Sequence, residues 1–101
     1  GMSKWYTYLD LKAVKEGSGG LQHFYAVVDE ILNRNEGCAL IRLWDRSKTT
    51  VVIKLLGSFV IMIDKGDVMR VHRFERRDQG DSYGTIGYGE PGKVTQVVLW
   101  R

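Results

Sequence analysis

The chain has 101 residues, of which 44% are hydrophobic and 27% charged, a composition typical of one folded domain rather than of a disordered segment. No apolar run approaches the roughly 18 residues that a membrane helix needs, and the start of the chain lacks a signal-peptide pattern. The single cysteine, Cys38, excludes an internal disulfide and favours a reducing compartment, so we expect the cytosol or the nucleus.

The positive charge is concentrated in the middle of the chain. The formal net charge is +3, but residues 34–77 contain ten Lys and Arg against five Asp and Glu, a net charge of +5. The two flanks together contain five basic and seven acidic residues, a net charge of −2. The central segment therefore suits an acidic partner such as nucleic acid, although a solvated surface of mixed charge gives the same pattern.

Short β-type runs separated by turn clusters dominate the chain. Before Leu21, the stretch WYTYLDLKAVKEGSGG predicts a short strand or a single helical turn. Residues 21–32 (LQHFYAVVDEIL), 38–44 (CALIRLW) and 50–56 (TVVIKLL) are predicted as strands. Alternation in the second and third strands predicts one buried face, formed by Ile41, Leu43, Val51, Ile53 and Leu55.

The second half of the chain continues this pattern. Residues 57–67 (GSFVIMIDKGD) are predicted to contain one short helical turn or an extended crossover, before a fourth strand that ends at Arg76. YGTIGY and VTQVVLW, split by GEPGK, complete the chain, giving five or six strands that indicate an all-β barrel or sandwich. We predict one domain over residues 1–101, with 1–20 as an N-terminal extension and 21–101 as the barrel.

GYGEPG (Gly87–Gly92) matches the G-x-G-x-x-G fingerprint of dinucleotide-binding proteins. That fingerprint requires a helix after the glycines, because the helix N-terminus receives the pyrophosphate. The run KVTQVVLW that follows is of β type, and Pro91 with its glycines favours a hairpin. The motif is therefore predicted to be a turn.

Candidate catalytic groups are few. His23 and His72 lie in strand-like runs with no Cys or second His at a metal-ligand spacing, and Cys38 has no neighbouring base in the sequence. We therefore expect a protein that is not an enzyme, and that binds no metal ion or nucleotide cofactor.

Aromatic and basic residues interleave on candidate strands and loops. Bases of a single strand stack on aromatic rings while Lys and Arg follow the phosphates, so this mixture is what single-strand binding needs. Each ring taken alone is equally consistent with packing in the core, and only the set favours a nucleic-acid surface. The candidate nucleic-acid-binding residues are Arg34, Arg42, Trp44, Lys54, Arg73, Gln79, Tyr83 and Tyr88.

Four segments occur in a familiar order: YTYLDLKAV, LQHFYAVV, LIRLWD and KGDVMRVHRF, from Tyr6 to Phe74. They resemble the first OB-fold of the telomere end-binding protein alpha subunit and the protection-of-telomeres proteins. The resemblance implies a five-stranded Greek-key barrel that binds single-stranded telomeric DNA across its second and third strands. It also implies a nuclear location at telomeres, with G-rich telomeric DNA and other telomere proteins as partners.

The resemblance assigns roles to two of the candidate residues. The last Arg of the GD-x-x-R-x-H-R motif, here Arg73, contacts DNA in the family, and so does a Gln of a Gln-Gly pair, which Gln79 resembles. Alternation places Arg70 and His72 on the opposite face from Arg73 unless a bulge intervenes.

This sequence differs from the family pattern at several positions, and these differences leave other functions open. Relatives often carry an aromatic residue at the end of the third strand, where this chain has Leu56–Gly57, and aromatic and basic residues late in the first, where it has Asp29 and Glu30. The leading hypothesis is a single-stranded telomeric DNA-binding OB-fold involved in chromosome-end protection. The second is a protein-interaction OB-fold of a telomere-capping or telomerase complex, and the third an RNA-binding or general single-strand module.

Overall fold

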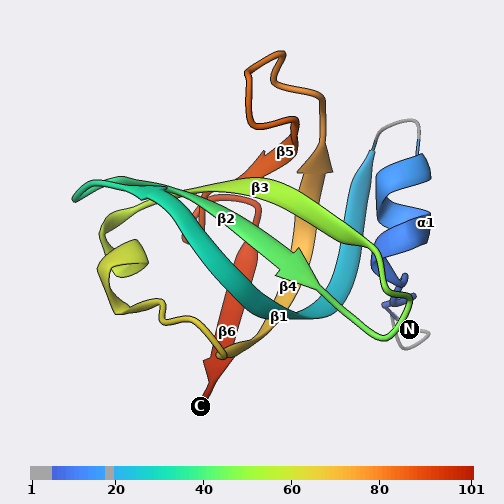
Figure 1. Ribbon diagram of the computed structural model, residues 1–101, viewed down its shortest axis with the longest axis horizontal. Helices are drawn as coiled ribbons and strands as arrows, with labels where there is room; N and C mark the ends of the chain where they lie inside the picture. Colours follow the sequence, from blue (N-terminus) through green and yellow to red (C-terminus); the bar gives the residue numbers. More distant parts are fainter. Residues whose placement is uncertain (1–5, 18–19) are drawn as a thin grey trace, which may run out of the picture.

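The computed structural model describes residues 6–17 and 20–101. In these ranges, six strands form one sheet that curls into a barrel, and two short helical segments lie beside it (Figure 1). The elements in chain order are α1 (Leu11–Glu16), β1 (Leu21–Arg34), β2 (Cys38–Trp44), β3 (Thr50–Leu56), the 3-10 helix η1 (Ser58–Met62), β4 (Val68–Arg76), β5 (Thr85–Gly89) and β6 (Gln96–Trp100).

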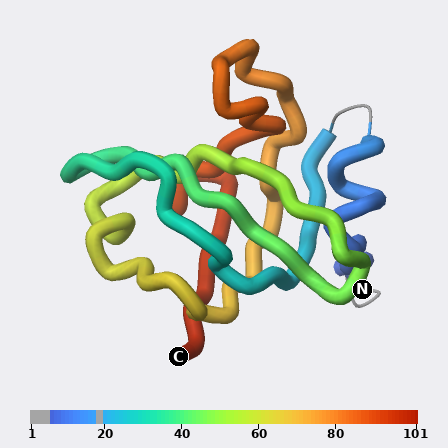
Figure 2. The backbone as a smooth tube through the Cα atoms, viewed as in Figure 1, coloured from blue at the N-terminus to red at the C-terminus, as the bar shows by residue number. Residues whose placement is uncertain are grey.

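Five of the strands close a ring. β1 pairs with both β2 and β4, β2 pairs with β3, β3 with β5, and β5 with β4. All of these pairs are antiparallel except β3 with β5, which is parallel, and the backbone in Figure 2 follows the same closed path. The predicted class, an all-β Greek-key OB-fold barrel with a short N-terminal extension, is confirmed.

The sixth strand is a continuation of the fifth. β6 pairs with residues 68–72 of β4, and β5 pairs with Glu75 and Arg76 of the same strand. Because β1 occupies the other edge of β4, both β5 and β6 lie on one edge, and residues 90–95 separate the two pieces. The barrel strand that closes the ring is therefore interrupted by a turn.

β1 is long enough to take part in two halves of the barrel. Residues 21–27 pair with β4 and residues 27–34 pair with β2. Its pairing with β2 shifts register twice, between Val28 and Glu30 and between Ile31 and Asn33. Such irregularities bend a strand and increase its twist, which lets β1 curve around the barrel.

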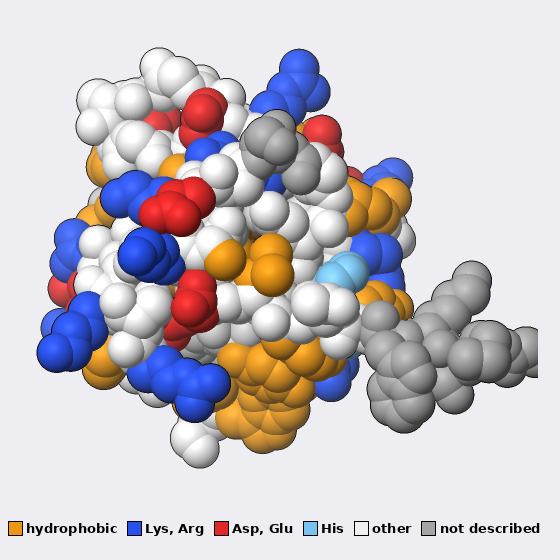
Figure 3. Space-filling view, turned by 90° about the vertical axis from the view of Figure 1, so that its right-hand side faces the viewer, with side chains coloured by type: hydrophobic (Ala, Val, Ile, Leu, Met, Phe, Trp, Pro, Cys, Tyr) orange, Lys and Arg blue, Asp and Glu red, His pale blue; other side chains and the backbone are white. Residues whose placement is uncertain are grey.

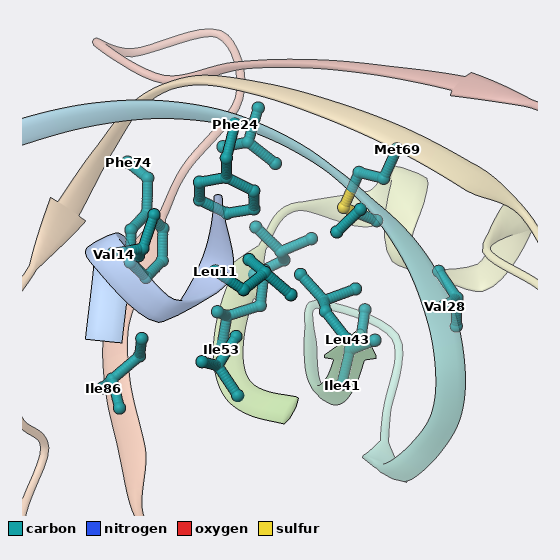
Figure 4. Packing of buried hydrophobic residues seen from close by; sticks show 14 of the residues in the cluster. Leu11, Val14, Phe24, Val28, Ile41, Leu43, Ile53, Met69, Phe74 and Ile86 are labelled. Carbon is teal, nitrogen blue, oxygen red and sulfur yellow. The ribbon is translucent and has the colours of Figure 1, made fainter. Parts of the chain in front are cut away.

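The core fills the ring and is closed at one end by α1. Phe24 and Phe74 meet edge to face with ring centroids 5.4 Å apart, and Leu11 and Val14 of α1 pack next to them (Figure 4). Asp10 caps this helix, because its carboxylate accepts a hydrogen bond of 2.8 Å from the Ala13 N–H. The predicted inward residues are between 0% and 3% exposed, which confirms the predicted face: Ile41, Leu43, Val51, Ile53 and Leu55.

The two segments for which the sequence left a helical turn and an extended conformation open each contain a short helix, α1 and η1. In the described ranges, neither helix is long and apolar enough to cross a membrane.

Candidate nucleic-acid interface

A hollow of about 310 Å³ lies between the β1–β2 hairpin and the loop that joins β4 to β5. We call this hollow the groove. It adjoins the outer side of β2 and β3, which is the face that the family resemblance assigns to the ligand. The residues that line the groove are Asn33, Asn35, Cys38, Leu40, Lys54, Gln79 and Asp81.

Lys54 lines the groove, and Tyr88 is its neighbour on the next strand. In the strand register, Lys54 of β3 is opposite Leu40 of β2 on one side and Tyr88 of β5 on the other. Lys54 forms no ion pair with the described part of the chain, so its ammonium group is available to an anion. A side-chain hydrogen bond with Glu75 and the charge of that carboxylate raise the pKa of Tyr88, so its phenol stays neutral.

The loop after β4 contributes polar groups to the groove. The Gln79 N–H donates to the Thr85 carbonyl at 2.9 Å, and the Gln79 side-chain amide donates to the Arg77 carbonyl at 2.7 Å. Hydrogen bonds from Thr85, above all, lower the pKa of Asp81, which keeps this carboxylate ionised. Tyr83, in the same loop, is 42% exposed.

Two candidate residues lie farther along β2. Arg42 forms an ion pair of 2.6 Å with Asp29 of β1, so its charge is already balanced. Trp44 ends the strand opposite Val27 and Thr50, and its side chain is exposed. The ring is accessible for stacking, but it lies at the end of β2 remote from the β1–β2 hairpin.

Arg34 has a structural contact rather than a free head group. Its guanidinium Nη1 donates to the carbonyls of Val60 and Ile63, at 3.1 and 2.5 Å, and so ties the tip of β1 to η1. Arg76 acts in the same way on α1, because its guanidinium donates to the carbonyls of Val14 and Lys15. Part of the positive charge of residues 34–77 therefore holds the fold together and is not an open surface.

A β-bulge decides where Arg73 lies. Val71 and Phe74 are both in the core, so two residues instead of one separate successive inward positions. His72 and Arg73 together face the single residue His23 of β1, and Arg73 has a φ of 58°. A positive φ at a residue other than glycine is uncommon and marks a local irregularity of the strand.

This bulge corrects the alternation that the sequence predicts for β4. Arg70, His72 and Arg73 all lie outside the hydrophobic core, and His72 is buried, at 5% exposed, because Tyr6 and Tyr8 pack against its ring. Arg73 donates from its Nη1 to the Tyr6 hydroxyl at 2.6 Å and its Nε donates to the Val94 carbonyl. Arg73 therefore lies on the β1–β4 side, away from Arg42 and Trp44.

Two histidines pack against the same bulge. The Nδ1 atom of His23 accepts from the Arg73 N–H at 2.9 Å, and the Nε2 atom of His72 shares a hydrogen bond of 2.6 Å with the Tyr8 hydroxyl. Burial lowers the pKa of both imidazoles, and nearby arginine charge lowers it further. Both rings are therefore neutral at pH 7, and the positive charge on this side comes from the arginines.

The GYGEPG motif is a strand end and a turn, as predicted. Gly87–Gly89 complete β5, and the chain then turns into β6 rather than into a helix. Gly87 is needed for packing, because a Cβ there would lie 2.2 Å from the Glu75 carbonyl oxygen and 2.5 Å from the Phe74 ring. In the described part of the chain, no cluster of three or more His, Cys, Asp or Glu side chains has a metal-binding arrangement.

The structure thus brings Lys54 and Gln79 together at the groove, with Tyr88 beside Lys54 in the strand register and Tyr83 in the same loop as Gln79. Arg34, Arg42 and Trp44 do not line the groove, although Arg42 is only two residues beyond the lining residue Leu40 on β2, and Arg73 lies on the neighbouring side of the barrel.

Sequence reasoning missed two groups of surface residues. The first is the polar lining of the groove: Asn33, Asn35 and Asp81. The second is a set of exposed rings outside it: Tyr6, Tyr8, Tyr25 and Trp100. The spacing of two between Tyr6 and Tyr8 was the available signal for the second group, because in an extended segment it places both rings on one side.

No family model and no curated protein matches the sequence. Among solved structures, the chain is similar to a murine DNA-binding protein bound with double-stranded DNA, with a TM-score of 0.71 and 17% sequence identity. The similarity covers 92% of this chain and 47% of the murine chain, so this domain spans about half the length of that protein. At this level of identity, the likeness shows the fold, and the chain is an OB-fold domain.

Proposed function

We propose that this domain is a non-enzymatic, single-stranded DNA-binding OB-fold whose ligand enters the groove between the β1–β2 hairpin and the β4–β5 loop. The observation that carries the proposal is the meeting of a free ammonium group and side-chain amides at one hollow, with the neutral phenol of Tyr88 next to that ammonium group in the strand register. The DNA-binding activity named for the murine neighbour supports a nucleic-acid partner.

Each group has a role that fits a single strand. The ammonium group of Lys54 meets a phosphate, and a base stacks on the adjacent ring of Tyr88. The amides of Asn33 and Gln79 donate to and accept from the edges of unpaired bases. Because the groove contains no helix N-terminus or metal site, binding depends on these side chains.

The finer proposal is G-rich telomeric DNA, bound in the nucleus at chromosome ends. It is supported by the sequence resemblance and by Asp81, whose ionised carboxylate lines the groove. Guanine presents an N2 amino donor that a carboxylate accepts, whereas a phosphate is repelled by the same charge. The groove therefore favours guanine over thymine at the position next to Asp81.

The test is fluorescence anisotropy of a G-rich and a scrambled single-stranded oligonucleotide at two salt concentrations. Lys54→Ala should weaken binding and reduce the salt dependence by about 0.7 in the log–log slope, the value for one phosphate contact of a single strand. Lys12→Ala, which removes an exposed charge from α1, is the matched control and should leave both unchanged. If the folded domain binds neither oligonucleotide at tens of micromolar, the proposal fails.

A protein-interaction domain of a telomere-capping or telomerase complex is the second candidate. The observation that favours it is the balanced charge next to the groove, where Asp29 neutralises Arg42 and Glu30 lies 3.5 Å from Lys65. A mixed face of this kind is less attractive to phosphates than a uniformly basic one. Loss of all oligonucleotide binding in the experiment above would leave this candidate in place.

A further inference from the structure

A series of aromatic rings crosses the outer side of β1, β4 and β6, outside the groove. We call Tyr6, Tyr8, Tyr25 and Trp100 the aromatic track; each is between 40% and 44% exposed. Ring centroids of Tyr8 and Tyr25 are 4.9 Å apart, and those of Tyr25 and Trp100 are 6.2 Å apart with an interplanar angle of 26°. Tyr6 lies over His72 at 4.0 Å, nearly parallel to it.

Hydrophobic side chains also gather on the side of the molecule that carries α1. Figure 3, which shows that side and counts tyrosine as hydrophobic, has them grouped in its lower part, while basic and acidic side chains mix on its left. An exposed apolar group of this kind on a small domain marks a contact surface.

Two arginines accompany the rings. The Arg70 guanidinium carbon is 6.0 Å from the Trp100 ring centroid, and that of Arg73 is 5.7 Å from the Tyr6 ring centroid. Arg73 donates to the Tyr6 hydroxyl and the Val94 carbonyl, and Arg70 donates to the Gln96 side chain, but neither arginine forms an ion pair within the described residues, so no carboxylate there neutralises either charge. Rings flanked by guanidinium groups that no carboxylate neutralises are the combination that binds bases and phosphates of a single strand.

The aromatic track is continuous with the groove. A second hollow, of about 410 Å³, has both Tyr88 and Arg73 in its lining. Tyr88 borders Lys54 in the groove, and Arg73 contacts Tyr6 at the start of the track. Inside the hollow, Glu75 and Glu90 are offset by Arg73 and Lys93, so its charges balance and it presents no electrostatic barrier to a strand.

We infer that the aromatic track is a second part of the nucleic-acid site, which a single strand reaches by leaving the groove over Tyr88 and passing Arg73. This inference rests on the proposed function of the groove. Single-stranded sites on OB-folds range from about 4 to about 16 nucleotides, so a longer strand engages both regions and a short one fills the groove alone. The track adds affinity without base selectivity, because every base has a face that stacks.

The test compares oligonucleotides of about 5 and about 16 nucleotides, which are the two ends of that range. Tyr25→Leu and Trp100→Leu remove rings while keeping apolar volume, and Tyr25→Phe keeps the ring. Each leucine variant should bind the long oligonucleotide between about fivefold and about 140-fold more weakly than the wild-type domain, which is the range for the loss of one stacked base. Tyr25→Phe should retain wild-type affinity, and thermal unfolding should show that every variant folds.

The outcomes separate the two proposals. If the groove binds DNA, Lys54→Ala lowers the affinity for both the short and the long oligonucleotide. If the track also binds DNA, Tyr25→Leu lowers the affinity for the long oligonucleotide only. If Lys54→Ala lowers the affinity for both oligonucleotides but neither leucine variant changes the affinity for the long one, the proposal that the track binds DNA is wrong. A protein partner would then be the remaining explanation for its exposed rings. If the wild-type domain binds neither oligonucleotide, the proposals for the groove and for the track are both wrong.

Discussion

The groove and the aromatic track are built in different ways on the same barrel. The groove is polar, and its lining comes from the β1–β2 hairpin, β3 and one loop. The track is made of rings from the N-terminal extension, β1 and β6, which lie far apart in the sequence. Hydrogen-bonding groups discriminate between bases, whereas stacking surfaces tolerate any base, so the proposed function gives the groove the selection of a sequence and the track the lengthening of the site.

The largest expected effect is a loss of folding stability, which would affect the groove and the aromatic track together. Phe74→Ala deletes a ring that is 0% exposed and packs edge to face on Phe24. Large-to-small changes of this kind cost about 3–5 kcal/mol, a large part of the stability of a small domain. Urea unfolding should show the loss, and Val94→Ala, at a 55% exposed position, should show almost none. Equal stability of the two variants would contradict the packing described for β4.

A smaller effect separates structural arginines from Lys54, the lysine proposed to bind DNA. Arg34→Ala removes the side-chain donor to the Ile63 carbonyl and one of two donors to the Val60 carbonyl, which also accepts from the Ile63 N–H, and should cost about 1.5–3 kcal/mol, typical of hydrogen bonds to a charged group. Lys54→Ala should leave stability unchanged and weaken DNA binding. Urea unfolding and anisotropy on both variants give the two readouts. A reversed result, with Arg34→Ala affecting binding alone, would return Arg34 to the DNA surface.

Local patterns predicted much of the fold. β2 and β3 have the predicted bounds, because alternation of apolar residues over seven positions specifies both a strand and its inward face. The turn within GYGEPG was also predicted correctly, since Pro and Gly favour a turn and a β-type run follows them.

Contacts between residues far apart in the chain could not be predicted from the sequence. The bulge at Arg73 depends on how β4 pairs with His23, fifty residues away, and no local signal marks a positive φ at an arginine. The partners of Arg34 and Arg42 likewise come from other elements. A candidate site chosen by residue type therefore mixed residues at the groove with residues whose side chains hold the barrel together.

Acid should affect the two regions at different pH. Burial lowers the pKa of His23 and His72 from 6.5, so below that value the unfolded chain binds more protons than the folded one. The free energy of unfolding should therefore fall as pH drops from 6.5 toward the folded pKa values. The pKa of Asp81, in the groove, is lowered from 3.8, so its contribution is lost only as pH falls below that value.

The measurement is urea unfolding at several pH values between about 7.5 and about 5, a range in which unperturbed histidine titrates and most carboxylates do not. The double variant His23→Gln, His72→Gln should flatten the profile. A wild-type profile that is already flat in this range would show that the histidines titrate equally in both states.

The smallest expected effect concerns the ion pair beside the groove. Asp29→Asn removes the carboxylate that holds Arg42 at 2.6 Å, and both side chains are more than a third exposed. Pairs of this kind contribute about 0–1 kcal/mol, so stability should hardly change. The released guanidinium is then free to meet a phosphate, and the salt dependence of DNA binding should steepen by about 0.7 in the log–log slope.

Glu30→Gln is the matched control for this change. Glu30 neighbours Asp29, but its partner is Lys65 at 3.5 Å, in the turn that precedes β4. Both variants raise the net charge by the same amount, so a general gain in attraction for DNA would appear in each. A steeper salt dependence in Asp29→Asn alone would place a phosphate at Arg42, on the path from the groove along β2. Equal slopes in the two variants would exclude Arg42 from the contact and leave Lys54 as the cation that the groove offers.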